Sequence, residues 1–122
     1  MPKYRINEKT YQCPTELTLA MIGGKWKLII LWHLVNEKKR YGELRKLIPE
    51  ITHKMLTQQL RELEEDKIIN RIVYNVIPPH VEYSLAGRGE KLKPMLALMV
   101  EWGLNVQREE LNEINREREA VS

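Results

Sequence analysis

The sequence predicts a mainly α-helical fold with one small β-hairpin, an α+β class. Apolar residues recur at the 3.6-residue helical period along most of the chain, and the period shortens to two residues only between Ile68 and Leu85. A chain of 122 residues has room for one ordinary hydrophobic core. We therefore expect a single domain over residues 1–122.

The composition is typical of a soluble globular protein, with 43% hydrophobic and 30% charged residues. No apolar run approaches the roughly 18 to 20 residues that a membrane helix needs, and the start lacks the apolar stretch of a signal peptide. We expect a cytoplasmic protein with no membrane partner. The single cysteine excludes an internal disulfide framework. The net charge is +3. Acidic residues outnumber basic ones after Gln107, so the preceding part of the chain is basic. A basic chain suits a polyanion ligand, but many other proteins have the same charge distribution.

Two helices are predicted in the first third of the chain. Pro14 suits the first turn of a helix and Gly23-Gly24 suits its end, so the first helix spans roughly Thr15 to Ile22. The stretch from Trp26 to Val35 is apolar almost all the way round. We expect it to be the central buried helix.

Residues 42–66 predict two short helices joined by a three-residue turn, a helix-turn-helix. Pro49 ends the first helix, because it supplies no amide hydrogen, and the Thr52 hydroxyl caps the second. The second helix has one apolar stripe, made of Met55, Leu56, Leu60 and Leu63. The opposite face carries hydrogen-bonding and basic side chains without a carboxylate, namely His53, Lys54, Thr57, Gln58 and Arg61. These residue types are the ones that read base edges when a recognition helix enters the major groove.

Residues 68–85 predict a two-stranded hairpin, because apolar and polar side chains alternate before and after Ile77-Pro78-Pro79-His80. Two prolines stiffen this turn, since they fix two backbone angles. A hairpin that follows a helix-turn-helix is the winged-helix arrangement. We expect its tip to reach the DNA backbone or minor groove beside the recognition helix.

A long helix is predicted from about residue 87 to about 106, kinked at Pro94. It carries two apolar stripes, one of which includes Leu96 and the other Trp102, and a monomer this small cannot cover both. We therefore expect a homodimer through the first, second and long C-terminal helices. The tail from Arg108 to Glu119 is expected to be either a short arm on the partner or a fraying helix.

Several dispersed motifs occur in one order along the chain: Cys13-Pro14, Ile22-Gly23-Gly24-Lys25-Trp26, Arg40-Tyr41-Gly42-Glu43-Leu44, the run from Leu56 to Asp66, Pro78-Pro79 with Val81-Glu82-Tyr83-Ser84-Leu85, and Glu101-Trp102-Gly103. With these motifs the chain resembles the HxlR-type family of bacterial winged helix-turn-helix transcriptional regulators, which are related to the MarR type. The resemblance runs from Cys13 to Gly103. One departure is Lys67, which replaces a glycine common after the acidic run, so this lysine must avoid a left-handed conformation or accept strain.

The resemblance implies a homodimer that binds double-stranded operator DNA. A palindromic operator would receive the two recognition helices roughly 34 to 36 Å apart. Base contacts fall to the outer face of the Thr52 helix, where Gln with adenine and Lys with guanine are sensible pairs. His53 is expected to touch phosphate or nothing, and Arg61 to meet the DNA backbone. With the phosphate contacts that the resemblance implies, the candidate DNA-binding residues are Arg40, Tyr41, His53, Lys54, Thr57, Gln58, Arg61, Arg71 and His80.

Cys13 is the candidate redox-sensing residue, because some family members sense oxidants or electrophiles through the matching cysteine. A sulfur at a helix start feels the positive end of the helix dipole, which favours its thiolate. The alternative is a partly buried cysteine without a sensing role. With no second cysteine, a disulfide must join Cys13 to Cys13 of another subunit or to a small thiol.

The predicted function is sequence-specific transcriptional regulation rather than catalysis. No nucleophile-base pair, carboxylate dyad or phosphate-binding glycine loop occurs, and His33, His53 and His80 lie far apart, so we expect no enzyme, metal site or cofactor. Two alternatives stay open. One is a winged-helix module that binds another protein, and the other is a regulator that responds to a small apolar effector at the dimer interface.

Overall fold

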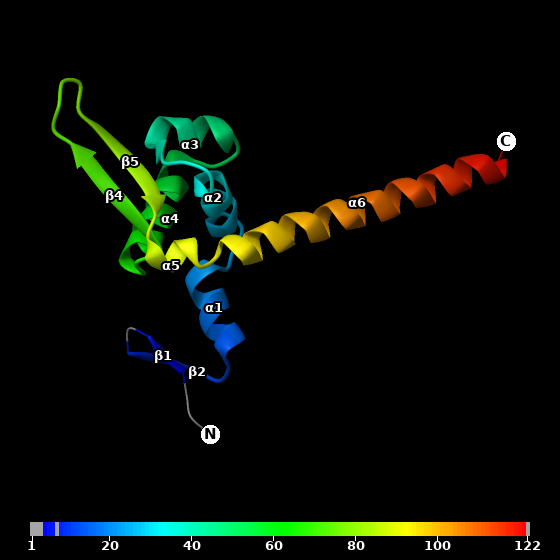
Figure 1. The fold of residues 1–122 in the computed structure, drawn as a ribbon, viewed down its shortest axis with the longest axis horizontal. Coiled ribbons are helices and arrows are strands. Elements are labelled where there is room, and N and C mark those ends of the chain that lie inside the picture. The colour runs from blue at the N-terminus through cyan, green and yellow to red at the C-terminus, as the bar shows by residue number, and fades with distance from the viewer. Residues whose placement is uncertain (1–3, 7, 122) are drawn as a thin grey trace. The chain divides into compact units, whose positions relative to one another are not determined.

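The computed structural model describes residues 4–6 and 8–121. These residues form two compact units, divided after Lys91. The elements of the first unit are β1 (Tyr4–Ile6), β2 (Lys9–Tyr11), α1 (Pro14–Ile22), α2 (Lys27–Leu34), β3 (Lys39–Arg40), α3 (Tyr41–Leu47), α4 (His53–Glu65), β4 (Ile69–Tyr74), β5 (His80–Leu85) and α5 (Gly87–Glu90). The second unit is built on one helix, α6 (Lys93–Val121) (Figure 1).

The strands make two antiparallel sheets. β1 pairs with β2, and a second sheet has the order β3-β5-β4. In the second sheet β4 and β5 form the predicted hairpin, with Arg71 opposite Tyr83, and β3 adds Arg40 opposite Glu82. Figure 1 shows this hairpin projecting beyond the helices of the first unit. The mainly helical fold with a β-hairpin wing is thus confirmed.

The core of the first unit is centred on α2, α3 and α4. Ile30 and Leu31 of α2, Leu44 of α3 and Leu56 of α4 have no exposed surface. Leu60 and Leu63 continue the buried stripe of α4, as the helical spacing predicts. α2 is only partly the buried helix that was expected, because its outer side leaves Ile29 and Trp32 exposed.

The helix-turn-helix forms as predicted, with a longer turn. α3 ends at Leu47, just before Pro49, and the Thr52 hydroxyl accepts a hydrogen bond from the backbone N–H of Met55 at 3.1 Å. The connection runs from Ile48 to Thr52, which corrects the predicted three-residue turn. Ile48 and Ile51 are buried and close the space between the two helices.

The helix expected from residue 87 to about 106 does begin at Gly87, but it is broken into two helices and its second part runs well past residue 106. α5 stops at Glu90, and α6 begins at Lys93, so that Pro94 lies in its first turn. This position suits proline, whose missing N–H would have no partner there in any case. α6 then continues as one helix to Val121, so the tail beyond Arg108 is helical and belongs to the same element.

Lys67 accepts the left-handed conformation, with φ of 60°. The N–H of Lys67 donates to the Glu64 carbonyl, and the N–H of Ile68 donates to the Leu63 carbonyl, both at 2.9 Å. Arg88 of α5 donates through Nη1 to the Asp66 carbonyl at 2.8 Å. The end of α4 is therefore well bonded, although its conformation costs a non-glycine residue energy.

Candidate nucleic-acid interface

The outer face of α4 presents three long polar side chains to solvent. Lys54, Gln58 and Arg61 are exposed and lie at i, i+4 and i+7, so they share one side of the helix. Within the described residues none of the three makes a hydrogen bond or ion pair with another side chain. The buried stripe holds the opposite side of α4 in the core, so these donors and acceptors face outward on a firmly placed helix.

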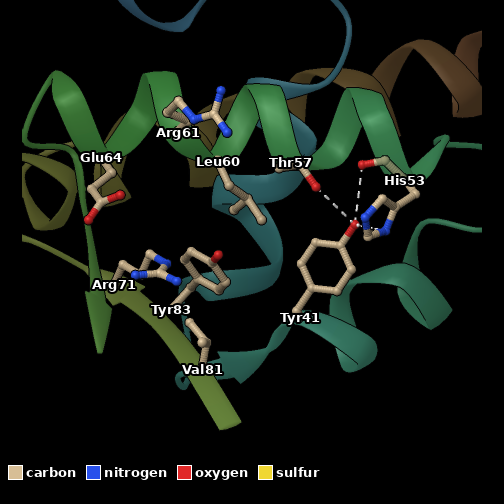
Figure 2. Close-up of a pocket in the computed structure, with 9 residues that line it drawn as sticks. All are labelled: Tyr41, His53, Thr57, Leu60, Arg61, Glu64, Arg71, Val81 and Tyr83. Atoms are coloured by element: carbon tan, nitrogen blue, oxygen red, sulfur yellow. Dashed lines mark hydrogen bonds between the residues drawn. The ribbon is translucent and has the colours of Figure 1, made fainter. Parts of the chain in front are cut away.

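The start of α4 carries a second group of polar side chains, already bonded to one another. The Tyr41 hydroxyl lies 2.6 Å from His53 Nδ1 and 3.2 Å from Thr57 Oγ1. It also lies 3.2 Å from the backbone carbonyl of His53. The two rings meet edge to face, with centroids 5.2 Å apart. Figure 2 shows the Tyr41 side chain rising from α3, with its hydroxyl between His53 and Thr57.

An open pocket of about 450 Å³ separates α4 from the wing. Arg61 and Glu64 line it from α4, and Arg71, Val81 and Tyr83 line it from β4 and β5 (Figure 2). The structure thus brings five of the predicted residues to one region: Tyr41, His53, Thr57, Arg61 and Arg71. Two guanidinium groups on neighbouring elements make this region attractive to phosphate.

His80 is placed differently from the other candidates. Its Nε2 lies 3.4 Å from Glu82 Oε1, and its ring stacks on Tyr74 with centroids 4.7 Å apart. Lys38 reaches the same carboxylate, with Nζ 3.1 Å from Glu82 Oε2. His80 is therefore half-buried in a cluster that joins the segment before β3 to the wing.

The electrostatics of this cluster favour the charged forms of the ion pair. Burial acts to raise the pKa of Glu82, but its contacts with Lys38 and Tyr74 outweigh burial and hold the pKa below its ordinary value. The same contact with Glu82 raises the pKa of Lys38. Sequence reasoning missed Lys38, Tyr74 and Glu82. The contact between His80 and Glu82 could have been predicted in part, because residues 80 and 82 of one strand point to the same face of the sheet.

Arg40 and Cys13 lie at the starts of two other helices. Arg40 is the exposed residue before α3, and its backbone N–H donates to Glu43 Oε1 at 2.9 Å. Cys13 is exposed and stands immediately before α1, with Pro14 as the first helical residue. None of the candidate DNA-binding residues lies on α1, so the structure does not bring Cys13 into the group on α4.

Residues 4–6 and 8–121 contain neither a metal-binding cluster nor a single membrane-spanning helix. No group of three or more His, Cys, Asp and Glu side chains there is placed to hold a metal ion. No single helix of that part is long and apolar enough to cross a membrane. Only α1 and α2 taken together reach that length and composition, and they are bent by 78°.

Comparison with known proteins places this architecture in a family. The model of the HxlR-like helix-turn-helix family matches residues 21–111. YtcD of Bacillus subtilis (strain 168), described as an HTH-type transcriptional regulator, is 55% identical over 100 residues, which is 82% of this chain and 79% of YtcD. The crystal structure of ytcD has a TM-score of 0.76, covering 80% of this chain and 99% of that one.

The solved structures of two further regulators have the same fold. The redox regulator HypR in its oxidized form is 53% identical, with a TM-score of 0.74, and the match covers 76% of this chain and 96% of that one. The reduced form of the transcriptional regulator YodB from B. subtilis is 33% identical, with a TM-score of 0.66, covering 75% and 91%. The chain belongs to the HxlR-like helix-turn-helix family of transcriptional regulators.

Proposed function

We propose that this protein binds a palindromic operator sequence-specifically as a homodimer and that oxidation of Cys13 controls this binding. The observation that carries the DNA-binding part is the outer face of α4, where Lys54, Gln58 and Arg61 are exposed and, among the residues that the structure describes, have no hydrogen-bond or ion-pair partner. A helix that exposes unpaired donors and acceptors while its other face is locked in a core suits insertion into a major groove. Such a regulator acts on the chromosome, so the proposed location is the cytoplasm.

The proposed contacts divide between bases and phosphates. Gln58 and Lys54 lie in the first turns of α4 and read base edges, while Arg61 and Arg71 border the pocket beside the wing and contact phosphate. Arg40 contributes a further phosphate contact from the start of α3. His80 is a weaker candidate for such a contact, because it is half-buried and its Nε2 already lies 3.4 Å from Glu82 Oε1.

The homodimer is supported by apolar side chains that the described residues leave uncovered. In the first unit Leu19 of α1 is 61% exposed, and Ile29 and Trp32 of α2 are 38% and 41% exposed. In the second unit Trp102 of α6 is 72% exposed. Apolar surface of this kind on successive helices marks a protein interface, and a second copy of the chain is the proposed partner.

The redox part rests on the exposure of Cys13 and on the likeness to HypR, which is named a redox regulator. Two Cys13 thiols from the two subunits form a disulfide when a peroxide takes up two electrons and two protons from them. A disulfide needs the two α-carbons within about 7 Å. Where the subunits hold the thiols farther apart, a mixed disulfide with a small thiol takes its place.

The test measures binding of the purified protein to DNA from upstream of its own gene and to a scrambled duplex, across salt concentrations. Sequence-selective binding that weakens steeply with salt supports the regulator, and Gln58→Ala is expected to cost about 1 to 3 kcal/mol of discrimination. Arg61→Ala is expected to weaken binding to both duplexes. It should also lower by about 1 the slope of the logarithm of the binding constant against the logarithm of the salt concentration. Lys9→Ala, an exposed lysine of β2, is the matched control.

The redox proposal is tested in the same assay with reduced and peroxide-treated protein. Peroxide is expected to change operator affinity in the wild type and not in Cys13→Ser. An equal response of the two proteins would discard the sensor and keep the regulator. If the protein shows no preference for any operator, the DNA-binding proposal fails and a protein partner becomes the alternative.

A further inference from the structure

We propose that Tyr41 is a positioning residue that fixes how two side chains of α4 read DNA. It holds His53 as a hydrogen-bond donor through Nε2 and Thr57 as a hydrogen-bond acceptor. This inference rests on the proposed operator binding and deepens it, because it assigns the class of base group that each residue recognises. It also replaces the direct DNA contact expected of Tyr41 with an indirect role.

The distances decide where the hydroxyl hydrogen of Tyr41 goes. A tyrosine hydroxyl has one hydrogen to donate, and three acceptors surround it: His53 Nδ1 at 2.6 Å, the His53 carbonyl at 3.2 Å and Thr57 Oγ1 at 3.2 Å. The 2.6 Å separation between the Tyr41 hydroxyl oxygen and His53 Nδ1 is the shortest of the three and is short for an N–H donor to oxygen, so we assign the hydroxyl hydrogen to this contact. The hydroxyl therefore donates to Nδ1, and the two longer contacts are secondary.

This assignment determines the tautomer of His53. In the neutral imidazole one ring nitrogen carries the hydrogen and the other accepts. With Nδ1 accepting from Tyr41, the hydrogen resides on Nε2. The edge-to-face packing of the two rings, 68° between their planes, holds the imidazole in this orientation. His53 is exposed, so its Nε2–H is available to a DNA acceptor.

The same assignment limits what Thr57 can do. Because the only hydrogen of the Tyr41 hydroxyl is used on His53, the Thr57 hydroxyl must donate its own hydrogen to the Tyr41 oxygen. With its hydrogen used in this way, the Thr57 oxygen can only accept, through its two lone pairs. Thr57 also lines the pocket beside the wing, so a base edge that enters there meets an acceptor.

The two roles select different groups in the major groove. The Nε2–H of His53 matches an acceptor, such as N7 or O6 of guanine, O4 of thymine or a phosphate oxygen. The Thr57 oxygen matches an amino group, N6 of adenine or N4 of cytosine. Residues 53 and 57 are one helical turn apart, so the two groups belong to neighbouring positions of the operator.

The first test reads the tautomer in the DNA-free protein by ¹⁵N NMR of the histidine rings. We expect the wild type to carry the hydrogen of His53 on Nε2 and Tyr41→Phe, which removes only the hydroxyl, to move the two ring ¹⁵N shifts toward each other. Tyr11→Phe is the matched control, and His53→Asn assigns the signals. The inference is overturned if the hydrogen of His53 lies on Nδ1 in the wild type. It is also overturned if the His53 ring ¹⁵N shifts of Tyr41→Phe are the same as those of the wild type.

The second test selects binding sites from a random-sequence duplex library. The wild type is expected to enrich adenine or cytosine at one position about tenfold, and Tyr41→Phe is expected to lose the preference there and at its neighbour only. Thr57→Val should lose only the preference for adenine or cytosine and keep the preference at the neighbouring position. Enrichment that is unchanged in Tyr41→Phe overturns the inference, whereas no enrichment by the wild type overturns the proposed function. Thermal unfolding checks that each variant is folded, and the wild-type NMR result needs only His53→Asn for its assignment.

Discussion

Individual side chains around α4 fall into two groups with different freedom. Lys54, Gln58 and Arg61 have no protein partner among the described residues and can adjust to a duplex. His53 and Thr57 are held by the Tyr41 hydroxyl before any duplex arrives. Ordering a long free side chain costs conformational entropy, whereas a side chain already held loses little on binding. The held pair therefore contacts bases at a smaller entropic cost than Lys54 and Gln58 do, whereas the free side chains can adjust their positions to the DNA surface.

Lys67 is the residue whose backbone conformation least suits its side chain. A non-glycine residue in the left-handed region costs roughly 1 to 2 kcal/mol, and glycine loses about 0.4 to 1 kcal/mol through its freer unfolded state. Because φ of Lys67 is 60°, we expect Lys67→Gly to raise the free energy of unfolding by about 0.5 to 1 kcal/mol. Urea unfolding measures this change. Lys67→Ala keeps the strained φ and should differ little from the wild type; a destabilised Lys67→Gly would contradict the argument.

His33 predicts a dependence of stability on pH. Burial lowers the pKa of His33 below 6.5, and the nearby Lys39 ammonium lowers it further. The unfolded chain then binds this proton more readily than the folded protein does, so the free energy of unfolding falls as pH drops below 6.5. We expect His33→Gln to make stability less sensitive to pH in the window just below that value. Urea unfolding at successive pH values checks the slope, and an unchanged slope would rule out this contribution.

At the scale of elements, α4 shows why some parts of this fold are predictable. Its cap, its apolar stripe and the proline before it are all local signals, and the structure confirms each of them. The β1–β2 hairpin was missed because each strand has only three residues, too few for an alternating pattern to register. The extent of α6 was underestimated because a polar helix end lacks the apolar stripe that marks a helix in sequence.

The packing of α5 depends on the absence of a side chain at Gly89. A β-carbon at Gly89 would lie 2.3 Å from the Ile68 carbonyl oxygen, which cannot move without shifting the end of α4 and the start of β4. We expect Gly89→Ala to lower the free energy of unfolding by about 1 to 3 kcal/mol. Chemical denaturation measures the loss.

Gly42 is the matched control for this substitution. It lies within α3, and a β-carbon there meets nothing within 4 Å. Gly42→Ala should therefore stabilise the protein by about 0.5 to 1 kcal/mol through helix propensity alone. If both alanine variants had the same effect, the steric explanation for Gly89 would be wrong.

At the scale of the whole molecule, the proposed dimer predicts the behaviour of Trp32→Glu. This change puts a charge among the uncovered apolar side chains of α2, and burying it at an interface is expected to weaken the dimer by about 2 kcal/mol or more. Sedimentation at low micromolar concentration should show monomer, with weaker operator binding. Val73→Glu makes the same kind of change on the exposed side of β4 and should leave the dimer intact. A Trp32→Glu protein that stays dimeric would remove α2 from the proposed interface.

The sequence by itself determined the helix-turn-helix, the wing and the family, because caps, turns and apolar periods act over a few residues and are visible in a single chain. It also located the polar face of α4. Only the tertiary structure decided which polar side chains are already bonded. Tyr41 meets His53 and Thr57, and Lys38 meets Glu82, across 12, 16 and 44 positions of sequence. Such contacts depend on how α3, α4 and the wing pack, and no local pattern encodes that packing.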